Sequence, residues 1–250
     1  MFSFFSVVIL LAGAAAGAIN TIVGSGSLVS YPAMVFLGIP PVSANIANTV
    51  GLMPGAIAGV VGYRQELREL PSSVVLRLSI ASSIGAIGGA WLLTWLPSKA
   101  FQLIVPALIG FAAILVAVAP LIARKTQSRS TRWGLLFVSV LLTGIYGGYF
   151  SAAQGVLLIG VLGLFLNIGL QHQNALKNLL QALVNTVAAI YFLLHGGIEW
   201  TAVLWLAIGS TIGSYFGAKI AKRIPTKYFR IFIVVFGLCM AIVMAMKIGQ

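Results

Sequence analysis

Residues 72–101 read SSVVLRLSIASSIGAIGGAWLLTWLPSKAF, and residues 200–229 read WTAVLWLAIGSTIGSYFGAKIAKRIPTKYF. Paired without a gap, the two stretches are identical at 12 of 30 positions. An apolar composition raises such a count, but it does not create the turn Pro-Ser/Thr-Lys-x-Phe that begins at both Pro97 and Pro225. The sequence therefore predicts an internal duplication, in which one structural unit occurs twice.

The composition places both copies in a lipid bilayer. Of the 250 residues, 60% are hydrophobic and 7% are charged, and the mean hydropathy is +1.07. A soluble domain carries about 25% charged residues, so lipid must cover most of this surface. Lipid permits only helices or closed barrels, and the apolar runs lack the alternation of barrel strands. We therefore expect an all-α membrane protein.

Each half contains about five hydrophobic segments. Two of the segments, 27–39 and 155–169, are shorter than the roughly 20 residues that a spanning helix needs. We expect these two to be broken or re-entrant helices, and whether they cross the membrane is left open. The first segment lacks the positive start of a signal peptide, so we expect it to be retained. The ten segments lie near residues 3–21, 27–39, 42–63, 72–96, 100–123, 133–151, 155–169, 172–194, 199–221 and 226–248.

The basic residues predict the orientation of the halves. Lys and Arg number 15 against 3 acidic residues, and they lie between the apolar segments, as in cytoplasmic loops of membrane proteins. This pattern explains the charge without a nucleic-acid partner. The first repeat (1–123) and the second (133–250) are joined by the basic segment 124–132, which we place in the cytoplasm.

Counting outward from this linker puts the basic segments 64–77 and 219–230 on the same side and the segments 97–99 and 195–198 on the other. The equivalent turns at Pro97 and Pro225 then face opposite sides of the membrane. The sequence thus predicts two repeats of inverted topology, an architecture typical of secondary transporters.

Three motifs resemble those of the TauE/SafE family of sulfite and organosulfonate exporters. They are GAINTIVGSGSL at residues 17–28 followed by Pro32, ANIANT at 44–49, and NALKN at 174–178. The family's glycine motif often reads GxGGG, whereas this chain has Gly24-Ser25-Gly26-Ser27, and its second copy is reduced to Gln154-Gly155. The resemblance implies transport of a small anion, often a sulfur oxyanion or organosulfonate, outward across a bacterial inner membrane. It does not identify the anion or the oligomeric state.

Two polar stripes are candidates for the substrate site. At an offset of 129, Asn45, Asn48 and Thr49 pair with residues 174, 177 and 178, and the spacing i, i+3, i+4 puts each trio on one helical face. Hydrogen bonding between helices explains such stripes almost as well as a substrate site does. Lys177 is the one basic residue that could lie deep, unless it snorkels to the cytoplasmic edge.

The two glycine-containing breaks are further candidates. A helix that starts after Gly26 presents free backbone N–H groups and the positive end of its dipole, which favour an anion. Close helix packing is the alternative, and it is our preferred interpretation for Gly85, Gly89, Gly213 and Gly217. The candidate substrate-binding residues are Asn20, Gly24, Ser25, Gly26, Ser27, Asn45, Asn48, Thr49, Gln154, Gly155, Asn174, Lys177, Asn178 and Gln181.

The acidic residues and cysteines are too few for most catalytic sites. Glu66, Glu69 and Glu199 are the only carboxylates, and Cys239 is the only cysteine. We therefore expect no catalytic residues, metal site or cofactor, and no ion coupling through buried carboxylates. A channel-like or importing permease for another organic anion and a non-transporting membrane scaffold remain the alternatives.

The predicted topology has a direct test. In a Cys239→Ser background, a cysteine at Ser128 is expected to react with a membrane-impermeant thiol reagent only from the cytoplasm, and one at Gly196 only from outside. Reaction of both from the same side would rule out the inverted repeat.

Overall fold

The computed structural model describes residues 4–125, 132–195, 197–221 and 227–248, and it describes no side chains for 119–125, 220–221, 227–229 and 247–248. All ten predicted segments are helices, which confirms the all-α fold. One short helix, α4, was not predicted. The helices are α1 (Phe4–Ile22), α2 (Ser27–Phe36), α3 (Pro41–Gly62), α4 (Arg64–Arg68), α5 (Ser72–Trp95), α6 (Ser98–Lys125), α7 (Trp133–Tyr149), α8 (Gln154–Phe165), α9 (Leu170–His195), α10 (Trp200–Ala221) and α11 (Lys227–Ile248).

Six helices in the described part of the chain are long and apolar enough to cross a bilayer: α1, α3, α5, α6, α9 and α10. Their outward faces are apolar too. On α5, for example, Leu76, Ile80, Ile84 and Ile87 form one exposed stripe at helical spacing. A helix surrounded by water would turn such a stripe inward, so the stripe faces lipid. The chain is a multi-pass membrane protein.

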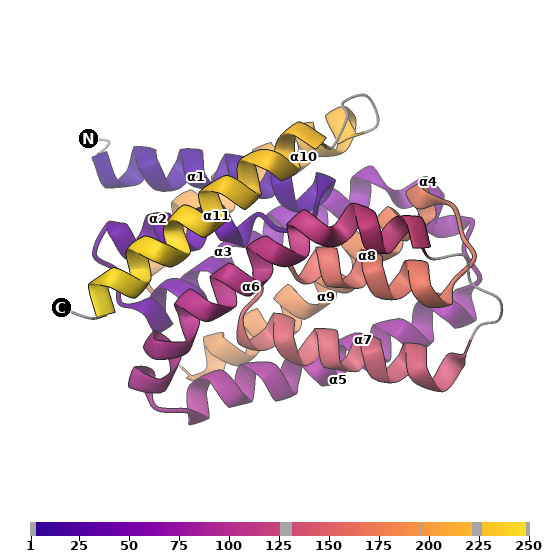
Figure 1. Ribbon diagram of the computed structural model, residues 1–250, viewed down its shortest axis with the longest axis horizontal. Helices are drawn as coiled ribbons and strands as arrows, with labels where there is room; N and C mark the ends of the chain where they lie inside the picture. The colour runs from indigo at the N-terminus through magenta and orange to yellow at the C-terminus, as the bar shows by residue number, and fades with distance from the viewer. Residues whose placement is uncertain (1–3, 126–131, 196, 222–226, 249–250) are drawn as a thin grey trace.

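Helix pairs approach closely where glycines line both partners. α1 packs along α10, and α5 packs in the same way along α7 (Figure 1). A methyl group at Gly213 would collide with the carbonyl of Ala14, and one at Gly85 with the carbonyl of Leu141. The same holds for Gly89 and Gly217, which confirms that these four glycines serve packing.

The order of long and short helices recurs in the two halves. α1, α3 and α6 begin 129 residues before α7, α9 and α11 respectively. Gly24, with a φ of +90°, also lies 129 residues before Ala153, the one non-glycine residue of positive φ in the described chain. This recurrence fits the predicted duplication. The inverted orientation and the repeat boundaries remain predictions, and residues 126–131 and the turn at Pro225 lie outside the description.

One end of the molecule gathers basic segments. Figure 1 shows α4 at the end opposite to both termini. There the Arg77 guanidinium lies 5.5 Å from the centre of the Trp133 ring at the start of α7. At the start of α9, His172 Nε2 lies 2.7 Å from Glu69 Oε2. The segment 64–77 therefore adjoins the end of the linker, as the charge count predicts for loops on one side of the membrane.

The glycine contacts predict opposite effects at two adjacent positions of α5. An added Cβ at Gly89 would overlap the backbone of α7, whereas at Gly88 its nearest neighbour would be Ile145 Cγ1 at 3.8 Å. Gly89→Ala should lower the free energy of unfolding by about 1–3 kcal/mol, as overpacking does. Gly88→Ala should leave it unchanged or raise it by up to about 1 kcal/mol, the helix propensity of alanine.

Thermal unfolding of both variants in detergent measures the difference. Equal stability of Gly88→Ala and Gly89→Ala would contradict the packing of α5 on α7.

Candidate functional site

Two interrupted helices meet inside the molecule. α1 ends at Ile22 before α2 begins, and α7 ends at Tyr149 before α8 begins. At the junction the Gly155 amide donates to the Gly24 carbonyl, with N and O 3.0 Å apart. A Cβ on Gly24 would lie 2.5 Å from Gly155 Cα. The contact therefore requires glycine at both positions. The positive φ of Gly24 is a second reason for glycine there.

Asn48 of α3 links the two breaks. Its Nδ2 donates to Ser27 Oγ at 3.0 Å and lies 3.4 Å from Ser151 Oγ, while its Oδ1 accepts from Ser30 Oγ. The hydroxyls of Ser27 and Ser151 are 3.0 Å apart and share a hydrogen bond. Ser30 and Ser151 were not among the predicted residues. Ser30 could have been found, since it lies three residues after Ser27 on the same helical face.

Asn45 and Thr49 of α3 have different partners. Asn45 Nδ2 donates to the Tyr149 carbonyl at the end of α7, at 2.8 Å. The Thr49 hydroxyl donates to the Asn45 carbonyl within its own helix, at 3.0 Å. Of the first predicted trio, two side chains therefore reach the break between α7 and α8, and one does not.

Lys177 of α9 is completely buried. Its Nζ donates to the carbonyls of Asn20 and Thr21, both at 3.1 Å. These carbonyls belong to the last turn of α1, where helical partners are missing and the dipole is negative. Asn178 Nδ2 lies 3.5 Å from the same Thr21 carbonyl. The structure thus places the Lys177 ammonium inside the protein at the break after α1, where it does not extend into solvent.

The Asn20 side chain ties α9 to the start of α2. Its Oδ1 accepts from the Gly26 amide at 2.6 Å and from Gln181 Nε2 at 3.3 Å. The Gly26 amide, which directly precedes α2, is therefore bonded within the protein, as is the Gly155 amide. These two amides are therefore open to an anion only if it displaces their bonds.

Two side chains at the centre lack partners. Ser25 and Gln154 are completely buried, and neither the Ser25 hydroxyl nor the Gln154 amide has a hydrogen-bond partner in the described part of the chain. The two residues lie 129 apart, so they are equivalent in the predicted repeat. Leaving a buried polar group unpaired costs about 1–3 kcal/mol, so such groups usually pair with protein, ordered water or a bound ion.

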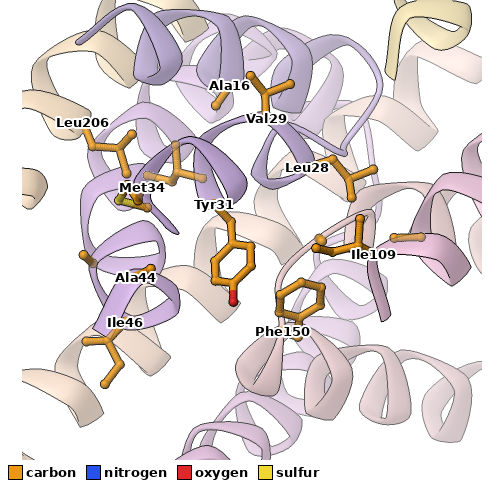
Figure 2. Close-up of a cluster of buried hydrophobic side chains, with 14 of the residues drawn as sticks. Ala16, Leu28, Val29, Tyr31, Met34, Ala44, Ile46, Ile109, Phe150 and Leu206 are labelled. Atoms are coloured by element: carbon orange, nitrogen blue, oxygen red, sulfur yellow. The ribbon is translucent and has the colours of Figure 1, made fainter. Parts of the chain in front are cut away.

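Aromatic rings lie at the break between α7 and α8. Tyr31 of α2 packs edge-on against Phe150, with ring centres 5.4 Å apart (Figure 2). The hydroxyls of Tyr31 and Tyr149 are buried and likewise have no partner among the described residues. Gly147 leaves room for the Gln154 amide, whose Nε2 would lie 2.6 Å from a Cβ there. Besides Ser25 and Gln154, two tyrosine hydroxyls therefore lack partners among the described residues.

Asn174 lies apart from the other predicted residues. It is half-buried and lines a cavity together with Val23 and Arg230. The second predicted trio therefore divides between this cavity and the break after α1. Within the described residues, no group of three His, Cys, Asp or Glu side chains could hold a metal ion.

Comparison with known proteins assigns the family. Residues 9–244 match the model of the family described as sulfite exporter TauE/SafE. The chain belongs to this family. The glycine motif that resembles the TauE/SafE motif contains Gly24, and its reduced copy contains Gly155. These two glycines lie at the two breaks, and they touch in the structure.

Several relatives of this TauE/SafE chain bear the name probable membrane transporter protein. ORF9 of Sinorhizobium sp is 26% identical over 228 residues, which cover 91% of this chain and 87% of that protein. YfcA of Escherichia coli K12 is 25% identical over 223 residues, covering 88% and 82%. YdhB of Bacillus subtilis 168 is 20% identical over 207 residues, covering 81% and 83%. Family and relatives agree on a membrane transporter.

Proposed function

We propose that this transporter moves a small oxyanion, of the sulfur oxyanion or organosulfonate class, outward across the inner membrane through the centre where the two breaks meet. One observation carries the proposal. Ser25 and Gln154, at equivalent positions of the two breaks, are completely buried and present a hydroxyl and an amide that have no partners in the described part of the chain. An oxyanion between them would accept the hydrogen bonds that these groups do not make.

The charges around the centre favour an anion over a cation. The completely buried Lys177 donates to two carbonyls, and its nearest charge compensation is the negative end of the α1 dipole. The chain has no Asp, and its three Glu residues lie in or beside α4 and before α10. At an effective dielectric of 20, a charge about 4 Å from Lys177 would interact with it by roughly 4 kcal/mol. This interaction stabilises a bound anion and destabilises a bound cation.

The membrane potential favours outward transport of an anion. One negative charge that leaves a cell gains about 2.3 kcal/mol per 100 mV of membrane potential. Efflux of an anion therefore needs no coupling ion, and the three Glu residues that could bind one lie in or beside α4 and before α10. The family description as sulfite exporters supports the same direction and the same class of substrate. The basic segments, which we place on the cytoplasmic side, follow the pattern of proteins in the inner membrane.

Replacing Gln154 should separate anion binding from stability. Gln154→Leu removes an unpaired buried amide at nearly constant volume, so the unfolding temperature should stay the same or rise. Anion affinity should fall at least tenfold, which corresponds to about 1.4 kcal/mol. Affinity is measured by thermal shift on the purified protein, and transport by flux into liposomes, with sulfite, sulfate, methanesulfonate and acetate.

Gln102→Leu, an exposed position on α6, is the matched control and should change neither quantity. Unchanged affinity and flux in Gln154→Leu would remove Gln154 from the site. Failure of the unmodified protein to move any of the four anions would contradict the proposed function.

A further inference from the structure

A cavity of about 90 Å³ lies beside the break between α1 and α2. Four helices contribute to its walls: the end of α1 and the early parts of α8, α9 and α11. It can hold several water molecules, because one water needs about 10–15 Å³ of such space. Its lining includes Ile22, Val23, Val156, Leu170, Asn174 and Arg230.

The cavity extends from the protein surface towards the central site. Leu170 is 63% exposed, and Asn174 and Arg230 are half-buried. Val23 and Val156 are buried at the other end. In the chain, Val23 directly precedes Gly24, and Val156 follows Gln154 by two residues. A ligand in the cavity would therefore lie next to both breaks.

Arg230 gives this cavity a specific chemistry. Its Nε is buried and has no hydrogen-bond partner among the described residues. None of the three Glu residues lines the cavity, so the positive charge of Arg230 faces no carboxylate there. A guanidinium presents N–H groups in a planar fork that matches two oxygens of an oxyanion, and the Asn174 amide can supply a further donor.

We propose that Arg230 and Asn174 form an entry subsite, in which an oxyanion binds before it passes to the centre at Ser25 and Gln154. This inference rests on the proposed function for the identity of the ligand. It also accounts for Asn174, which belongs to a predicted trio but lies outside the central cluster. The basic end of the molecule, where α9 and α11 begin, is the side from which the anion would enter.

Thiol labelling tests the subsite without any need for transport. In a Cys239→Ser background, Leu170→Cys places a thiol at the exposed rim of the cavity. Its reaction rates are measured with an anionic and a cationic methanethiosulfonate reagent, in detergent and at low salt, where charge effects are strongest. Arg230→Gln should lower the ratio of the anionic to the cationic rate at least fivefold, and Arg230→Lys should keep most of it.

Sulfate is the ligand probe in the same experiment. At 10 mM it should slow labelling at least threefold compared with sodium chloride of equal ionic strength, and Arg230→Gln should abolish this protection. Arg77→Gln is the control, since Arg77 is exposed, lies over Trp133 at the same end of the molecule and does not line the cavity. It should change neither the ratio nor the protection.

The outcomes separate the two proposals. If Arg230→Gln leaves both the rate ratio and the protection unchanged, the subsite is wrong, whatever the protein transports. If both effects appear while liposome flux fails for all four anions, the subsite holds and the proposed transport function is wrong.

Discussion

The hydrogen bond from the Gly155 amide to the Gly24 carbonyl is the interaction on which this structure depends. A bilayer offers no water to a broken helix, so every backbone group that a break exposes needs a partner inside the protein. Here two breaks partly satisfy each other. Their contact brings the ends of four helix segments together and thereby fixes where the polar side chains of α3 and α9 must lie.

Polar side chains satisfy several of the backbone groups that the breaks leave unpaired. Asn45 bonds the last turn of α7, and Lys177 bonds the last turn of α1. Asn20 bonds the start of α2. In the proposed function, hydrogen bonding between helices and substrate binding are therefore not alternatives, since the same stripes build the centre in which Ser25 and Gln154 have no partner among the described residues. A transporter requires donors that stay available to its substrate, at a cost to stability.

Much of this was predictable from the sequence, because spanning helices depend on local hydropathy. The ten segments, the short α2 and α8 and the packing role of Gly89 follow from runs of apolar residues and from glycine spacing. The sequence could not decide the tertiary contacts between helices. The burial of Lys177 depends on where α1 ends relative to α9. The bond from Gly26 to Asn20 depends on how the chain turns between α1 and α2. The split between Asn174 and Lys177 depends on the position of Arg230 on α11, which lines a cavity together with Asn174.

A cross-link between the two breaks tests the central claim most directly. Ser27 Oγ and Ser151 Oγ are 3.0 Å apart, so Ser27→Cys and Ser151→Cys in a Cys239→Ser background should form a disulfide, whose sulfurs lie about 2.05 Å apart. With a protease site inserted between Lys125 and Arg132, the cleaved halves should stay joined on a non-reducing gel after mild oxidation. Separation of the halves, in protein that is still folded, would show that the breaks do not meet.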